Sequence, residues 1–285
     1  MPIPKAVELS RIRYAERTTK RKIWKAEELI AYALKKHGDR VAVSASFGAC
    51  STVVLHLVLQ QKPDVKVIFN NTGVEYKETY KYRDRLKKEW NLNLIETKPY
   101  GTIYDPESKK HLPANFWTCV KVYGLPLTRA EGGKPKCCEY LKEYPLRRAC
   151  LLNNINALIT GIRLAESSVR LWTIQKKGMY YYSESYFKHF VYHPIAYWSH
   201  DEVIDYFKTH DIPLNEMYIK GNYRTGCVPC TSFLNWEKDL AKYNKKLYAL
   251  IQKMKGKTII DNWLEYEEKM AEGCQPDKAQ EKLPI

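Results

Sequence analysis

The hydrophobic and polar positions follow two alternating patterns over the first 165 residues. Short apolar runs rich in β-branched residues, which are typical of buried strands, alternate with segments whose apolar residues recur at helical spacing. The strand pattern covers residues 41–46, 65–71, 92–99 and 155–162. The helical pattern covers residues 22–38, 51–61 and 78–90. This alternation predicts an α/β fold with a parallel sheet that helices cover on both faces.

The pattern weakens after residue 165, where helices become the main expectation. Residues 199–213 predict a helix with Ser199 as its N-cap and Glu202 at the capping-box position. Residues 236–254 are also helical in pattern, and the last dozen residues predict a polar, mobile tail. We expect three parts, which are a helical arm at 1–39, an α/β domain at 40–232 and a helical extension with the tail at 233–285.

Composition and charge narrow the class of protein. The chain has 285 residues, 45% of them hydrophobic and 28% charged, which excludes a disordered or fibrous chain. It has no apolar run long enough to span a membrane and no apolar segment typical of a secretory signal, so we expect a cytoplasmic protein. Lys and Arg number 47 against 32 Asp and Glu, a net charge of +15. This excess predicts an anionic partner, which can be a nucleic acid or a phosphorylated small molecule.

The segment SASFGACS, residues 44–51, joins the first strand to a helix and is a candidate anion-binding loop. Its backbone N–H groups and the following helix N-terminus are suited to an anion, although an ordinary β–α turn also uses small residues. The loop has no lysine of the GxxxxGK[ST] type and no GxGxxG pattern. A second loop follows the strand at 65–71, at the strand ends where open α/β sheets bind ligands. The candidate binding residues in these loops are Ser46, Phe47, Gly48, Ser51, Thr72 and Gly73.

Four of the eight cysteines form two close groups, an adjacent pair and a C-x-x-C. Such thiols suit a tetrahedral zinc ion or an iron–sulfur cluster. Adjacent cysteines point in different directions on a regular helix, which favours a multi-iron cluster over a single zinc, unless the pair is only coincidental. The four residues are Cys137, Cys138, Cys227 and Cys230.

The remaining cysteines carry weaker signals. Cys119 and Cys150 are interpreted as buried packing residues, and Cys50 in the first loop as packing with a possible role near a ligand. Cys274 stands alone near the tail. An exposed tail cysteine can deliver a thiolate nucleophile to a site, and the alternative is a surface cysteine without a role.

Five segments together carry a family resemblance. They are SFGAC at 46–50, NNTGVEYKETY at 70–80, CCEYLKEYPL at 137–146, TGIRLAESSVR at 160–170 and the long stretch from Tyr192 to Thr231. They resemble the sulfonucleotide reductases, which reduce adenylyl sulfate or phosphoadenylyl sulfate, within the adenine-nucleotide α-hydrolase-like superfamily. The resemblance covers about residues 40–232. The basic, small and hydroxyl residues that match the family pattern are Lys142, Gly161, Arg163, Ser167 and Arg170.

The resemblance implies a Rossmann-like fold and a thiol-driven reaction. It implies a 4Fe–4S cluster on the four paired cysteines, with Lys142, Arg163 and Arg170 holding the anionic substrate. A tail cysteine, Cys274 by its position, attacks the sulfur of the activated sulfate, and thioredoxin or a similar dithiol then releases sulfite. A homodimer is expected, and nucleic acid and membrane are not expected as partners.

Two other functions remain open from the sequence. The net charge and the basic residues of the N-terminal arm also suit an ATP-dependent tRNA sulfurtransferase of the same fold, although the first loop lacks the lysine-bearing pattern used for ATP pyrophosphate. A non-catalytic redox sensor or RNA-binding module that uses the cluster is the third possibility. The basic residues of the arm are Arg11, Arg13, Arg17, Lys20, Arg21 and Lys22.

Overall fold

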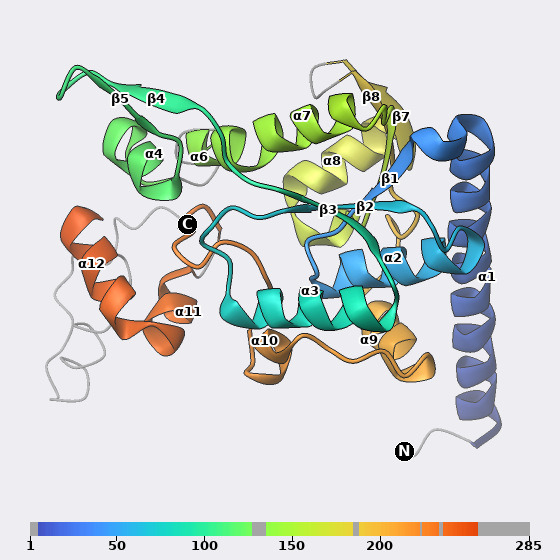
Figure 1. The fold of residues 1–285 in the computed structure, drawn as a ribbon. Helices are drawn as coiled ribbons and strands as arrows, with labels where there is room; N and C mark the ends of the chain where they lie inside the picture. Colours follow the sequence, from blue (N-terminus) through green and yellow to red (C-terminus); the bar gives the residue numbers. More distant parts are fainter. Residues whose placement is uncertain (1–4, 127–134, 185–187, 223, 234–235, 256–285) are drawn as a thin grey trace, which may run out of the picture. The chain divides into compact units, whose positions relative to one another are not determined.

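The computed structural model describes residues 5–126, 135–184, 188–222, 224–233 and 236–255, with the backbone alone at 5–19 and 255 (Figure 1). The chain divides into two compact units. The first unit comprises Met1–Val122 and Cys137–Cys227, and the second comprises Tyr123–Lys136 and Val228–Ile285. The expected polar tail, with Cys274, lies outside the described residues.

A six-stranded sheet forms the centre of the first unit, in the order β3-β2-β1-β6-β8-β7. Its members are β1 (Val41–Ser44), β2 (Lys66–Asn70), β3 (Asn93–Thr97), β6 (Ala157–Thr160), β7 (Tyr180–Ser183) and β8 (His189–Tyr192). Neighbouring strands pair in parallel except β7, which is antiparallel to β8. The four strands predicted from the sequence are therefore confirmed, as is the mostly parallel α/β class.

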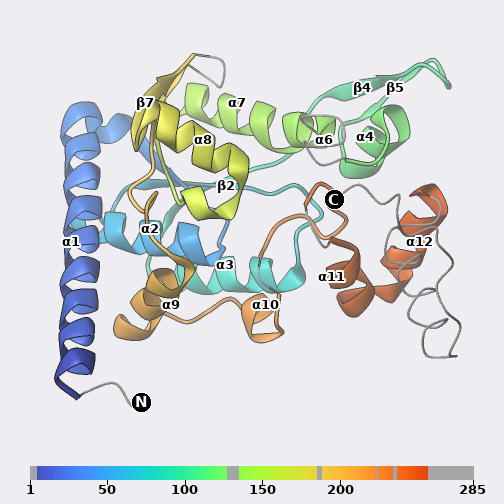
Figure 2. The ribbon, with the colours of Figure 1, turned by 180° about the vertical axis from the view of Figure 1, so that it is seen from behind.

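Helices cover both faces of this sheet (Figures 1 and 2). The cluster that includes β-strand residues Val43 and Ile159 also includes residues of α1, α2, α3 and α9, whereas Leu158 belongs to a second cluster with α7. Successive strand residues point to opposite faces, so both faces of these short strands are apolar. The helices are α1 (Lys5–His37), α2 (Ala49–Gln61), α3 (Lys77–Glu89), α7 (Tyr144–Leu152), α8 (Ser168–Lys177), α9 (His200–Thr209) and α10 (Glu216–Ile219).

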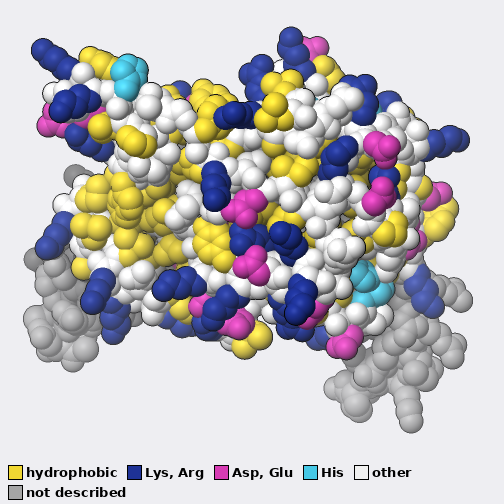
Figure 3. All heavy atoms as spheres, viewed as in Figure 1, with side chains coloured by type: hydrophobic (Ala, Val, Ile, Leu, Met, Phe, Trp, Pro, Cys, Tyr) yellow, Lys and Arg dark blue, Asp and Glu magenta, His cyan; other side chains and the backbone are white. Residues whose placement is uncertain are grey.

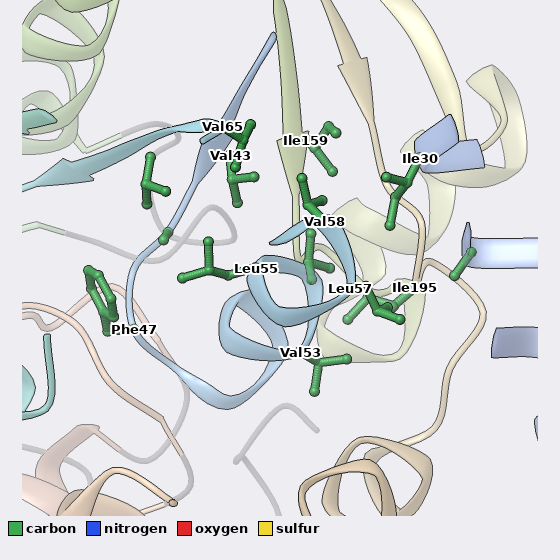
Figure 4. Packing of buried hydrophobic residues seen from close by; sticks show 14 of the residues in the cluster. Ile30, Val43, Phe47, Val53, Leu55, Leu57, Val58, Val65, Ile159 and Ile195 are labelled. Carbon is green, nitrogen blue, oxygen red and sulfur yellow. The ribbon is translucent and has the colours of Figure 1, made fainter. Parts of the chain in front are cut away.

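Helix α2 is the most completely buried helix segment beside the sheet. Figure 4 shows Leu55 and Val58 on the side of α2 that faces Val43 and Ile159. Leu55, Val58 and Val43 are all fully buried. Because α2 begins directly at the first loop, this packing fixes the position of the loop as well as that of the helix.

The helix predicted at 199–213 begins as expected. The hydroxyl of Ser199 accepts the backbone N–H of Glu202 at 3.1 Å, and the Glu202 carboxylate accepts the Ser199 N–H at 2.7 Å. This reciprocal capping box satisfies two N–H groups that the first turn of a helix leaves without intrahelical partners.

Besides β7, β8, α7, α8 and α10, the following elements were not predicted from the sequence. The antiparallel hairpin β4 (Thr102–Asp105) and β5 (Lys110–Pro113) is followed by α4 (Phe116–Tyr123). Helix α6 (Lys136–Cys138) continues into η2 (Glu139–Glu143), a turn of π-helix. Two short 3₁₀ turns complete the list, η1 (Gly38–Arg40) and η3 (Leu164–Glu166).

The second unit has its own small apolar core. It contains α11 (Trp236–Tyr243) and α12 (Lys245–Lys255), which replace the single helix predicted at 236–254. Trp236, Leu240 and Ile251 are buried together. Asn244 separates the two helices, and its side-chain oxygen accepts the N–H of Leu247 at 3.1 Å, as an N-cap does.

Surface character adds two observations. Among the helices that the structure describes, none has both the length and the apolar character needed to cross a bilayer. On the face shown in Figure 3, Lys and Arg side chains are spread out and interspersed with Asp and Glu. The positive charge on that face therefore does not gather into one continuous basic patch.

The position of α2 predicts a large cost for shortening Leu55. Leu55→Ala removes a fully buried side chain and should lower the free energy of unfolding by about 3 kcal/mol. Leu152→Ala is the matched control, because this leucine is 75% exposed and its loss should cost less than about 0.5 kcal/mol. Urea unfolding followed by circular dichroism measures both, and equal effects would contradict the assigned packing.

Candidate active site

The site begins where β1 and β6 end side by side. Ser44, the last residue of β1, pairs with Thr160, the last residue of β6. The next strands in the sheet lead away in opposite directions, with β2 and β3 beyond β1 and β8 and β7 beyond β6. The loops that follow β1 and β6 therefore leave the same edge at a topological switch point, which is where open α/β sheets bind ligands.

The β1–α2 loop, residues 44–51, is shaped by two residues. Phe47 has a φ of 55°, unusual for a non-glycine residue, and its fully buried ring packs edge-on against Phe69 at 5.4 Å between centroids. Gly48 is the N-cap of α2. Phe47 thus anchors the loop in the core, and a ligand can meet only the backbone of this predicted binding residue.

The two serines predicted in this loop are close together. Ser51 is buried and lies within hydrogen-bond distance of the Gly48 carbonyl at 3.0 Å and of the Ser46 hydroxyl at 3.2 Å. Ser46 is exposed. The loop therefore presents the hydroxyl of Ser46 beside the N-terminus of α2, whose partial positive charge favours an anion.

Gly161 touches the backbone of this loop. A Cβ at Gly161 would lie 2.6 Å from the carbonyl carbon of Cys50 and from the backbone nitrogen of Ser51. Real Cβ atoms do not approach backbone so closely. The glycine predicted to belong to the site is thus explained by close contact between the end of β6 and the first turn of α2.

A segment from much later in the chain lies against the same loop. The Asn215 side chain donates to the Phe47 carbonyl at 3.2 Å, and the Tyr218 hydroxyl accepts the N–H of Ala49 at 2.9 Å. A Cβ on Gly48 would lie 2.6 Å from the Thr225 hydroxyl. Tyr218 therefore satisfies one of the N–H groups at the start of α2, and Gly48 leaves room for Thr225.

Arginines and a carboxylate lie beside the loop. The buried Arg163 donates from Nε to the Cys50 sulfur at 3.0 Å and from a terminal nitrogen to the Trp198 carbonyl at 3.1 Å. Arg170 forms an ion pair with Glu166. The structure thus brings both predicted arginines to the loop, but holds Arg163 in place with protein acceptors.

Ser167 has a structural role in this arrangement. It is the N-cap of α8, and its hydroxyl accepts the Arg170 N–H at 3.3 Å. Desolvation is the main cause that lowers the pKa of Arg170, and the positive charges of Arg224 and Arg163 lower it further. Three guanidinium groups therefore act on one another at this edge of the sheet.

A buried histidine, His193, lies near enough to Arg170 to be affected by its charge. His193 lies 2.7 Å from the Thr160 hydroxyl through Nδ1. Burial, and then the charge of Arg170, lower the pKa of His193 to about 4. This histidine is therefore neutral near pH 7 and adds no positive charge to the site.

The loop after β2 forms a separate part of the site. The Thr72 hydroxyl donates to the Glu75 carboxylate at 3.0 Å and lies 3.4 Å from the Cys227 sulfur. Gly73 has a φ of 79°, a backbone conformation that favours glycine. Thr72 and Gly73 line a cavity of about 520 Å³, whereas Ser46, Phe47, Gly48 and Ser51 do not line it.

The cysteine pair lies where the helix is distorted. Cys137 and Cys138 are the last residues of α6, and the π turn η2 follows directly. Such π turns are frequent at functional sites, because they offset the regular positions of side chains on a helix. Lys142, which is half-buried, belongs to the same turn.

The other thiols differ in character. Burial, with a smaller effect of Cys138, raises the pKa of Cys119 to about 11, and burial raises that of Cys150 to about 12. Both are therefore protonated packing residues near pH 7, as the sequence predicts. Cys230, in the second unit, lies 3.3 Å from the Ser232 hydroxyl.

The four predicted cluster ligands supply the right donor chemistry. Thiols are the usual ligands of iron–sulfur clusters, and Cys138 and Cys227 are partly exposed. Within the described part of the chain, no group of three or more His, Cys, Asp or Glu side chains is arranged to hold a metal ion. The ligand set fits a cluster by donor type, and its assignment stays a prediction.

Solved structures of known proteins have a similar fold. The phosphoadenylyl-sulfate reductase of Candida auris is similar in structure over 71% of this chain and 88% of its own, with a TM-score of 0.53 and 20% identity. The FMN adenylyltransferase of Candida glabrata, bound to FAD and pyrophosphate, covers 74% of this chain and 63% of its own, with a TM-score of 0.52 and 14% identity. These two proteins thus share the mostly parallel α/β fold of this chain.

Sequence comparison gives the family. The family model described as the phosphoadenosine phosphosulfate reductase domain matches residues 40–233, and the chain belongs to this family. An adenosine 5'-phosphosulfate reductase of Staphylococcus haemolyticus is 31% identical over 207 residues, which is 73% of this chain and 76% of the relative. A phosphoadenosine 5'-phosphosulfate reductase of Xanthomonas axonopodis pv. citri is 30% identical over 228 residues, 79% and 85% of the two chains. The resemblance and the enzyme class, an oxidoreductase, are confirmed.

The structure adds residues that the sequence did not assign to the site. Tyr218 and Thr225 lie against the β1–α2 loop, and Glu166 and Arg224 lie among the arginines. All four lie in segments that carry the family resemblance, residues 160–170 and 192–231, and that resemblance was the signal that could have found them. Their contacts, by contrast, join segments that are distant in the chain.

Because Gly161 lies so close to the backbone of the β1–α2 loop, we expect a methyl group at this position to disturb the loop locally. Gly161→Ala should displace the first turn of α2, speed hydrogen exchange in residues 48–52 and lower the unfolding free energy by about 1–3 kcal/mol. Gly178→Ala is the control, because nothing lies within 4 Å of its Cβ position, although its φ of 80°, unlike the backbone at Gly161, disfavours alanine. The control should lose some stability without faster exchange in the loop, and unchanged exchange in Gly161→Ala would refute the contact.

Proposed function

We propose that this protein reduces an activated sulfate nucleotide, phosphoadenylyl sulfate or adenylyl sulfate, to sulfite. The observation that carries the proposal is the convergence of Arg163 and Arg170 on a β1–α2 loop without lysine, in a chain whose family match spans residues 40–233. The substrate carries several negative charges, which guanidinium groups and a helix N-terminus bind well. The names of the relatives include both nucleotides, and the excess positive charge favours the phospho form.

The proposed reaction transfers the sulfo group to a thiolate and then releases it as sulfite. The Cys274 thiolate attacks the sulfur of the sulfo group, and the bond between that sulfur and the phosphate oxygen breaks. Adenosine 3',5'-bisphosphate or AMP leaves, and Cys274 carries an S-sulfonate. A thiolate of thioredoxin or a similar dithiol then attacks the Cys274 sulfur, which expels sulfite and leaves a mixed disulfide. The second thiol of the donor, as thiolate, attacks this mixed disulfide, which closes the donor disulfide and frees the Cys274 thiolate. The dithiol thus supplies the two electrons.

The other site residues have supporting roles in this proposal. Arg163, Arg170 and Lys142 stabilise the negative charge of the phosphate as the nucleotide leaves. Ser46, Gly48 and Ser51 bind through the backbone and hydroxyl groups of the loop, and the backbone of Phe47 completes it. Thr72, Gly73, Gly161 and Ser167 shape the site. We further propose a cytoplasmic homodimer.

We also propose that Cys137, Cys138, Cys227 and Cys230 hold a 4Fe–4S cluster. When bound, such a cluster supplies a redox-active centre whose potential depends on burial and on hydrogen bonds to its sulfurs. The Thr72 hydroxyl at 3.4 Å and the Glu75 carboxylate at 3.7 Å orient the Cys227 thiol. These two side chains connect the cluster ligand to the loop that follows β2.

Sulfite release tests the proposed reaction. Under anaerobic conditions with reduced thioredoxin, we expect sulfite from phosphoadenylyl sulfate or adenylyl sulfate, and competition binding ranks the two nucleotides. Cys274→Ser should abolish turnover because the nucleophile is lost, with unchanged iron content. Nucleotide binding without sulfite would contradict the reaction, and tRNA-dependent cleavage of ATP to AMP would indicate the sulfurtransferase instead.

Metal content tests the cluster separately. Protein purified without oxygen should contain about four iron atoms per chain. Cys227→Ala should lose most of this iron, whereas the control Cys150→Ala, at a fully buried cysteine, should keep it. Zinc in place of iron, or equal iron in both variants, would refute the ligand assignment.

A further inference from the structure

The Glu166 carboxylate makes a set of contacts that a bound anion would also make. One oxygen lies 3.4 Å from the Cys50 thiol, and the other accepts the backbone N–H of Arg163 at 3.3 Å. The same carboxylate lies 3.9 Å from Nε of Arg163 and forms the ion pair with Arg170. Glu166 is an exposed residue, with 23% of its side-chain surface accessible.

Two partners of Glu166, Arg163 and Arg170, are residues to which the proposed function assigns substrate binding. Guanidinium groups bind carboxylates, phosphates and sulfates through the same N–H donors. Arg163 is already held by the Cys50 sulfur and the Trp198 carbonyl, so Arg170, with a side chain that is 44% exposed, is the better placed of the two to change partner.

We propose that Glu166 is a specificity-determining residue that competes with the nucleotide for Arg170. An incoming phosphate or sulfo group must displace the Glu166 carboxylate from Arg170 or bind beside it against its negative charge. Either way the carboxylate weakens the binding of anionic ligands at this position and leaves uncharged ligands unaffected. This inference rests on the proposed function, because it takes a sulfonucleotide as the ligand of the arginines.

Glu166→Gln separates this competition from a structural role. The glutamine amide keeps the length of the side chain and an oxygen that can accept the Arg163 N–H, so the turn η3 retains its cap. It removes the charge that holds Arg170. Glu89→Gln is the matched control, because Glu89 also pairs with an arginine, Arg85, at 2.7 Å on the exposed surface of α3.

Calorimetric titration of the full-length protein with adenosine 3',5'-bisphosphate, AMP and adenosine is the test. Glu166→Gln should bind adenosine 3',5'-bisphosphate and AMP about fivefold or more tightly than the wild type, with no change for adenosine. Glu89→Gln should match the wild type for all three ligands. In an Arg170→Met background, the gain from Glu166→Gln should disappear, because the two residues act through one interaction.

Any other pattern of binding overturns the inference. Equal or weaker binding of adenosine 3',5'-bisphosphate by Glu166→Gln would make Glu166 an anchor for Arg170 and not a competitor. A gain that persists without Arg170, or that extends to adenosine, would exclude the proposed contact. Absence of binding for all three ligands would overturn both this inference and the proposed nucleotide site. The expected binding pattern without sulfite release would refute the proposed reaction alone.

Discussion

The close contact between Gly161 and the β1–α2 loop is the constraint on which the rest of the site depends. Strands β1 and β6 end level with each other, so their loops must share the space just beyond the sheet. A side chain as small as a methyl group at Gly161 would meet the backbone of Cys50 and Ser51. The absence of that group lets the chain continue directly to Arg163, whose guanidinium then lies against the Cys50 sulfur. One glycine therefore places an arginine beside a helix N-terminus.

The two arginines of the site differ in how the fold surrounds their charges. The buried Arg163 is surrounded by protein acceptors, which offset the cost of removing a charge from water. Arg170 is more exposed and has a carboxylate partner. Because His193 remains neutral near pH 7, the positive charge of this region comes from guanidinium groups, which do not change their charge across the physiological pH range.

The sequence predicted the parts of the structure whose signals are local. The strands at the centre of the sheet are short apolar runs buried on both faces, and the N-cap at Ser199 lies in a capping box. The hairpin β4–β5 was missed because residues such as Asp105 and Lys110 interrupt any apolar alternation. The π turn after Cys138 has no known sequence signature. At the site, Gly161 and Arg163 were identified from a motif, but the partners of Arg163 come from elements far apart in the chain.

The hydrogen bond between Ala49 and Tyr218 bears on the order in which the chain folds during its synthesis. It spans 169 positions, and the bond from Asn215 to Phe47 spans 168. During synthesis the β1–α2 loop leaves the ribosome long before the segment that holds it. Contacts of such large sequence separation form late, because the intervening chain must first be ordered. The growing chain can therefore build its sheet while the β1–α2 loop still lacks these partners, and the candidate site is completed only as the segment that matches the family ends.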